Sequence, residues 1–70
     1  MRTFGEILKA KRIAIYGTQQ ALADRLGVAK NTVCAWERGK AYPSMWYAPA
    51  LAAAFNCSLD ELFGLEEAGE

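Results

Sequence analysis

Cationic and amide side chains gather between residues 30 and 40 of this 70-residue chain. Successive residues of a helix are turned by 100°. On this spacing, the outward side holds Asn31, Cys34, Ala35 and Arg38, with Lys30 and Thr32 flanking them. The inward side holds Ala29, Val33, Trp36 and Glu37. The outward side carries no carboxylate, whereas a solvated helix usually mixes both signs. Amide and ammonium groups can donate to base edges, and small Cys34 and Ala35 leave room for a flat surface. Contact with nucleic-acid bases is therefore favoured, with plain solvation as the alternative for Lys30 and Asn31.

Groups for other chemistry are scarce. The chain has no histidine, two isolated cysteines and a cluster of acids near its end, so neither a nucleophile–base pair nor a metal-ligand set can be assembled. A chain of this size also leaves little room for a deep cleft. We therefore expect no enzyme, no metal, no cofactor and no small-molecule ligand.

The composition favours a cytoplasmic protein. Charged residues break up the first dozen positions, which excludes a signal peptide there. The longest uncharged stretch, residues 41–57, contains Pro43 and Pro49 and is shorter than the roughly 18 apolar residues that span a bilayer. In a reducing compartment, Cys34 and Cys57 are expected as free, buried thiols rather than as a disulfide.

Charge is divided unevenly along the chain, although the net charge is zero. Residues 1–40 hold all eight Lys and Arg against three acids, a net +5, and residues 41–70 hold five acids and no base, a net −5. Such a division either marks an electrostatic footprint on one side or arises by chance in a small domain.

Capping residues and glycines divide the chain into five short helices. Thr3 with Glu6 forms a capping box for a helix to about Arg12 or Ala14, and Thr18 can cap Gln19–Leu26 before Gly27. A third helix is predicted from about Lys30 to Arg38, ended by Gly39. No segment alternates with period two for long enough to form a strand, so the fold class is all-α.

The second half is less regular. We expect a loop over residues 40–48, with Ser44 as a candidate cap, and a fourth helix centred on residues 50–55 with Pro49 in its irregular first turn. Ser58 and Glu61 form a second capping box, which starts a short helix through Phe63. Residues 1–65 are predicted to form one domain, followed by a frayed acidic tail at 66–70.

The second and third predicted helices have the spacing of a helix-turn-helix. Two helices joined by a three- to four-residue turn cross closely only if the contact residue is small and the turn adopts positive φ. Ala23 supplies the small residue and Gly27 the turn. Val28, Val33 and Trp36 supply apolar positions around them.

These residues resemble the Cro and phage-repressor family of helix-turn-helix domains, of the xenobiotic-response-element type. The resemblance runs from Phe4 to Phe63 and lies in residues 18–23, 26–28, 31–33, 36–40 with Pro43, and 58–62. It implies a lambda-repressor-like DNA-binding domain and a homodimeric transcriptional regulator on an inverted repeat in double-stranded DNA. A repressor is expected, since no separate activation or effector domain fits in 70 residues. A protein-interaction module or an antitoxin-like partner on the same scaffold is the alternative.

The family's roles carry over residue by residue. The resemblance implies base contacts from Lys30, Asn31, Thr32 and Ala35, and phosphate contacts from Thr18, Gln19, Arg38 and Lys40. It implies a structural ion pair between Arg12 and Glu37. Dimer candidates are Asn56, Ser58, Leu59, Phe63 and Leu65, although Leu59, Leu62 and Phe63 could instead complete the core, as we expect for Leu62.

Two departures from the family stand out. Ala29 replaces the usual serine or threonine cap of the third helix, which forfeits about 1 kcal/mol of local stability. The segment around Trp46 and Tyr47 is unusually aromatic. These two residues could belong to the core, contact a phosphate, or lie in an oligomer surface.

Overall fold

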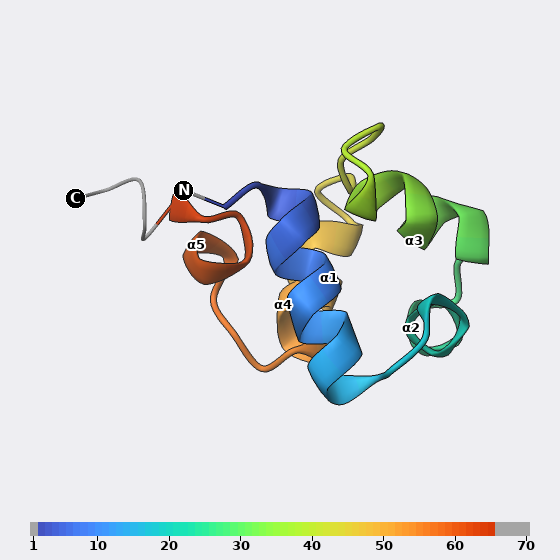
Figure 1. Ribbon diagram of the computed structural model, residues 1–70. Coiled ribbons are helices and arrows are strands. Elements are labelled where there is room, and N and C mark those ends of the chain that lie inside the picture. The colour runs from blue at the N-terminus through green and yellow to red at the C-terminus, as the bar shows by residue number, and fades with distance from the viewer. Residues whose placement is uncertain (1, 66–70) are drawn as a thin grey trace.

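The computed structural model describes residues 2–65, which form five α-helices and no strand (Figure 1). The helices are α1 (Phe4–Ile15), α2 (Gln19–Leu26), α3 (Lys30–Glu37), α4 (Tyr47–Ala54) and α5 (Leu59–Leu62). In Figure 1, α4 lies behind α1, with α2 and α3 on one side and α5 on the other. The predicted all-α class is confirmed. The predicted tail, residues 66–70, lies outside the described residues, so the division at residue 65 stays a prediction.

Side-chain caps begin three of the helices. The hydroxyl of Thr3 accepts from the Glu6 N–H at 3.2 Å, and the Glu6 carboxylate accepts from the Thr3 N–H at 2.8 Å, which completes a capping box. Thr18 and Ser58 each accept an N–H from three residues further on at 3.0 Å. Ala29 gives α3 no such bond. The caps predicted at Thr3 and Thr18, the hydroxyl bond of the predicted Ser58 capping box and the missing cap at Ala29 are therefore confirmed.

Helix α4 begins earlier than predicted. The carbonyl of Ser44 accepts the N–H groups of Tyr47 and Ala48 at 3.0 and 2.9 Å, and these bonds start the helix before Pro49. Pro49 falls in the first turn, as expected, where its missing N–H costs nothing. The carbonyl of Ser44, rather than its side chain, therefore sets this boundary.

The core lies where the five helices meet. Phe4 stacks on Phe63 with ring centroids 4.6 Å apart, and Leu62 is fully buried, as expected. The rest of the core cluster comprises Leu8, Leu22, Ala23, Val33, Trp36, Leu51, Ala52 and Phe55. Within residues 2–65, no helix is both long and apolar enough to cross a bilayer.

Helix α1 approaches α3 closely at Gly5. A Cβ atom on this residue would lie 2.5 Å from the carbonyl oxygen of Glu37 and 3.0 Å from that of Trp36. Both neighbours are main-chain atoms of the last turn of α3, so neither can turn aside. The backbone contact therefore requires glycine here.

Two side-chain placements differ from the predictions. Ala29 was expected on the inward side of the third helix but is exposed, because it precedes the helix in an extended conformation, to which the 100° spacing does not apply. Cys34 and Cys57 are not joined in a disulfide, as expected, but both are half-buried rather than buried.

Candidate nucleic-acid interface

A tight turn over residues 27–29 joins α2 to α3. Gly27 adopts φ 74°, in the left-handed region that favours glycine, and the Val28 N–H donates to the Ala23 carbonyl at 3.0 Å. Ala23 is fully buried. The two helices thus form the predicted helix-turn-helix.

The first turn of α3 faces outward. Lys30 and Asn31 are exposed, and Thr32 and Ala35 are half-buried beside them. On the opposite side, Val33 and Trp36 lie in the core. The main-chain N–H groups of Lys30 and Asn31 have no acceptor within residues 2–65. This turn therefore presents side-chain and main-chain donors together, without a carboxylate among them.

The predicted phosphate-contacting residues divide into two groups. Thr18 and Gln19 are already engaged: the Thr18 hydroxyl caps α2, and the Gln19 amide donates to Glu37 Oε1 at 3.1 Å. The main-chain N–H groups of Gln19 and its neighbour Gln20 have no acceptor in the described part of the chain. Arg38 and Lys40 follow α3 and are exposed.

A half-buried network ties α1 to the last turn of α3. Arg12 donates from Nε and Nη2 to the two carboxylate oxygens of Glu37, each at 2.8 Å, and from Nη1 to the Gly17 carbonyl at 2.6 Å. The Arg12 and Glu37 side chains are 9% and 3% exposed. The structure thus pairs Arg12 with Glu37 in the fork geometry that suits guanidinium and carboxylate.

This network neutralises Glu37 beside the outward face of α3. Burial raises the pKa of Glu37, but hydrogen bonds from Arg12 and Gln19 outweigh it, so the pKa lies below its usual range. Hydrogen bonding to Glu37 in turn raises the pKa of Arg12. No carboxylate occurs from residue 38 to residue 59. The segment that follows α3 in sequence therefore adds no negative charge beside this face.

The dimer candidates lie at the far end of the chain and differ in exposure. Leu59 and Leu65 are 43% and 56% exposed, and Asn56 and Ser58 are also exposed. Phe63 is half-buried, since its ring stacks on Phe4. Of the three residues that could have completed the core, Leu62 does so fully, Phe63 partly, and Leu59 does not.

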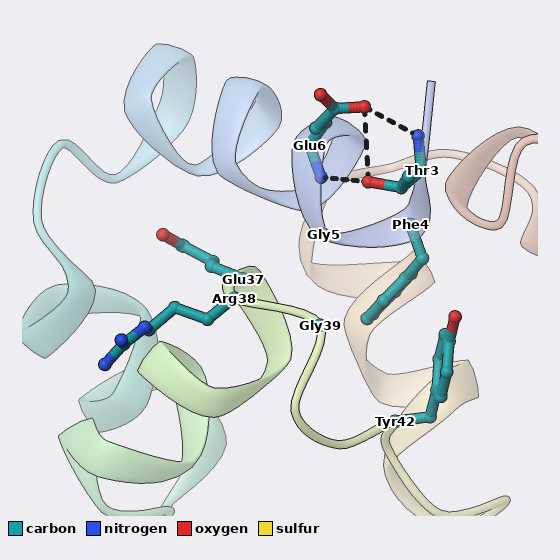
Figure 2. A pocket seen from close by; sticks show the side chains of 8 residues that line it. All are labelled: Thr3, Phe4, Gly5, Glu6, Glu37, Arg38, Gly39 and Tyr42. Carbon is teal, nitrogen blue, oxygen red and sulfur yellow. Dashed lines mark hydrogen bonds between the residues drawn. The ribbon is translucent and has the colours of Figure 1, made fainter. Parts of the chain in front are cut away.

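A pocket of about 420 Å³ lies between the first turn of α1 and residues 37–42 (Figure 2). Its ionisable groups do not converge. The Glu6 carboxylate bonds to Thr3, and the side chains of Glu37 and Arg38 point away from Phe4 and Tyr42. Within residues 2–65, no group of three His, Cys, Asp or Glu side chains could hold a metal ion. The pocket offers neither acid–base nor metal chemistry, and none of the predicted base-contacting residues lines it.

Sequence reasoning missed one residue and one contact that position the interface. Gly5 allows the close contact of α1 with α3, and its place inside a helix was a usable signal, because such a glycine costs about 1 kcal/mol unless packing requires it. The bond from Gln19 to Glu37 had no sequence signal, since it depends on how α2 and α3 cross.

Comparisons with known proteins agree with this geometry. A model of the helix-turn-helix family matches residues 8–62. The transcriptional activator BcrR of Enterococcus faecalis is 36% identical over 91% of the chain, which spans 31% of the BcrR length. An uncharacterized helix-turn-helix regulator of Archaeoglobus fulgidus is 35% identical, with 86% of this chain and 84% of that protein covered. The crystal structure of the P22 c2 repressor with a synthetic operator superposes with a TM-score of 0.84 at 32% identity, over 90% of this chain and 96% of that one.

Proposed function

The chain belongs to the Cro and phage-repressor-like helix-turn-helix family, and from this premise we propose that it binds operator DNA as a homodimeric, cytoplasmic repressor of transcription. The observation that carries the proposal is the first turn of α3, where exposed Lys30 and Asn31 stand beside unpaired N–H groups and no carboxylate. Proteins of this fold place that turn in the major groove. Asn31 can pair bidentately with adenine, and Lys30 can donate to guanine. Thr32 and Ala35 complete the surface that meets the base edges.

Phosphate contacts fix the position of α3 in the groove. The unpaired N–H groups of Gln19 and Gln20 begin an eight-residue helix, where the helix dipole favours an anion. The amide of Gln19 has a second hydrogen besides the one that it donates to Glu37, so it can join the Arg12–Glu37 network to a phosphate. Thr18 holds this turn in place as its cap, and Arg38 and Lys40 supply charge after α3.

A dimer reads two half-sites. One module of this size buries too little DNA surface for tight, specific binding, so a second copy is needed. Exposed Leu59 and Leu65, with Asn56, Ser58 and the half-buried Phe63, form the mixed apolar and polar surface that we assign to the dimer contact. Similarity to the P22 c2 repressor along 90% of the chain supports repression.

Selection of binding sites from random duplexes, followed by a salt titration, tests the proposal. We expect an inverted repeat with half-site centres about 10 base pairs apart. Arg38 and Lys40 from both copies neutralise about four phosphates, so affinity should fall roughly 150-fold between about 50 and 200 mM salt. Flat salt dependence would favour a protein partner instead. A single asymmetric site would contradict the dimer, and higher transcription from a reporter with the selected site would contradict repression.

A further inference from the structure

Two of the most exposed apolar side chains in the described residues are adjacent in the segment between α3 and α4. Met45 is 92% exposed and Trp46 is 82% exposed. Two other aromatic rings of this segment contact core residues: the Tyr42 ring, although 68% exposed, has its centroid 5.5 Å from that of Phe4, and the half-buried Tyr47 ring has its centroid 6.3 Å from that of Trp36. Neither Met45 nor Trp46 packs on the core cluster. A large apolar pair left in water between residues that contact the core indicates a surface that binds something.

This pair lies beside the C-terminal end of α3. Trp46 directly precedes Tyr47, whose ring is near Trp36 in the last turn of α3. In Figure 1 the connecting segment leaves that end of α3 and returns to start α4 behind α1. Eight residues of helix span about 12 Å, which is also about the width of the major groove. When Lys30 and Asn31, at the N-terminal end of α3, contact the base edges, the C-terminal end of α3 therefore reaches the sugar–phosphate strand that borders the groove.

The charge around the pair matches that strand. Arg38 and Lys40 precede it in sequence, and no carboxylate occurs between Glu37 and Asp60. The first turn of α4 is not itself an anion site, because the carbonyl of Ser44 takes the N–H groups of Tyr47 and Ala48 and Pro49 has none. What the segment offers is an apolar surface and an indole N–H beside positive charge. Deoxyribose rings between phosphates present the complementary surface.

We propose that Met45 and Trp46 pack against the deoxyribose–phosphate backbone at the edge of the occupied major groove, with Arg38 and Lys40 on adjacent phosphates. The inference rests on the proposed DNA binding and adds a contact that anchors the protein without reading sequence. Its contribution comes from apolar burial, so it should not depend on salt.

Tryptophan fluorescence reports the contact directly. Trp36 is 3% exposed, so quenching by acrylamide, a neutral molecule, acts mainly on Trp46. Adding the selected duplex at low salt should reduce this quenching to the level of the Trp46→Phe variant, in which only buried Trp36 emits. The quenching of that variant should be the same with and without duplex.

A substitution series separates the possible results. Trp46→Ala should raise the Kd roughly tenfold for the selected duplex and for unrelated duplexes, with the salt slope unchanged. Lys40→Ala removes one phosphate contact from each copy and should reduce the slope by about two. Ile13→Ala, which removes a 54% exposed side chain from α1, is the matched control and should change nothing. Circular dichroism confirms that each variant is folded.

Three results would overturn the inference. A Trp46 side chain as accessible in the complex as in the free protein would contradict the contact and leave the proposed function standing. Quenching that decreases as the protein concentration rises, with no duplex present, would show that a second copy of the chain covers Trp46. Failure to bind any duplex at low salt would remove the inference and the proposed function together.

Discussion

Replacing Glu37 by alanine should remove a large part of the free energy of unfolding. The substitution leaves Arg12, whose side chain is 9% exposed, without the two 2.8 Å bonds that compensate its charge, and it also frees the Gln19 amide. Removing one partner of a buried ion pair typically costs about 3–5 kcal/mol. A domain of 70 residues has a total stability of about 4–10 kcal/mol, so about half of it would be lost.

Urea denaturation followed by circular dichroism measures the loss, and thermal denaturation should show the midpoint falling by more than about 12 °C. The double variant Arg12→Met with Glu37→Met should be more stable than either single variant, because it leaves no buried charge without a partner. Lys11 and Glu61 provide the control within the same molecule. They form an ion pair between α1 and α5 with side chains 22% and 46% exposed, and Glu61→Ala should cost at most about 1 kcal/mol.

Two results would refute this reasoning. A cost for Glu37→Ala no larger than that for Glu61→Ala would mean that burial of the pair has no energetic consequence. If the losses of unfolding free energy caused by Arg12→Met and by Glu37→Met simply add in the double variant, the two side chains do not interact.

Three further predictions follow from single contacts. Gly5→Ala should cost about 2 kcal/mol in urea denaturation, since the new Cβ would lie 2.5 Å from the Glu37 carbonyl oxygen; a gain in stability, as helix propensity alone predicts, would contradict the contact. Ala29→Ser should add about 1 kcal/mol, because the extended backbone at this exposed position suits a capping hydroxyl; unchanged stability would show that no cap forms. The pKa of Glu37 is lower in the folded than in the unfolded chain, so its stabilisation is present above pH 4.5, the ordinary value, and is lost as the pH falls through the folded value. Glu37→Gln should lack this part of the pH profile of stability, and an unaltered profile would contradict the assignment.

The local structure could be predicted because local residues determine it. Thr3, Thr18 and Ser58 cap helices through bonds to N–H groups three residues away, and Gly27 marks the turn by its own φ preference. The boundary of α4 was missed because a main-chain carbonyl, that of Ser44, starts the helix, and every residue type carries that group.

Contacts between helices were harder to predict. The requirement for Gly5 and the turn of Gln19 toward Glu37 both depend on how helices distant in sequence approach each other. The sequence pattern predicted a phosphate contact for the Gln19 amide at the start of α2. It gave no sign of the hydrogen bond from this amide to the buried Glu37 carboxylate. For Trp46 the sequence left three roles open, and its 82% exposure excludes only the core.

The central claim is that the exposed first turn of α3 reads base pairs, and repeating the site selection with Asn31→Ala tests it most directly. Arg25→Ala, which changes an exposed residue of α2, is the control. The account predicts that Asn31→Ala loses the preference for adenine at one position of each half-site and keeps the half-site spacing, while Arg25→Ala selects the same sites as the unaltered protein. Selection of identical sites by Asn31→Ala and the unaltered protein, at every position, would contradict the account.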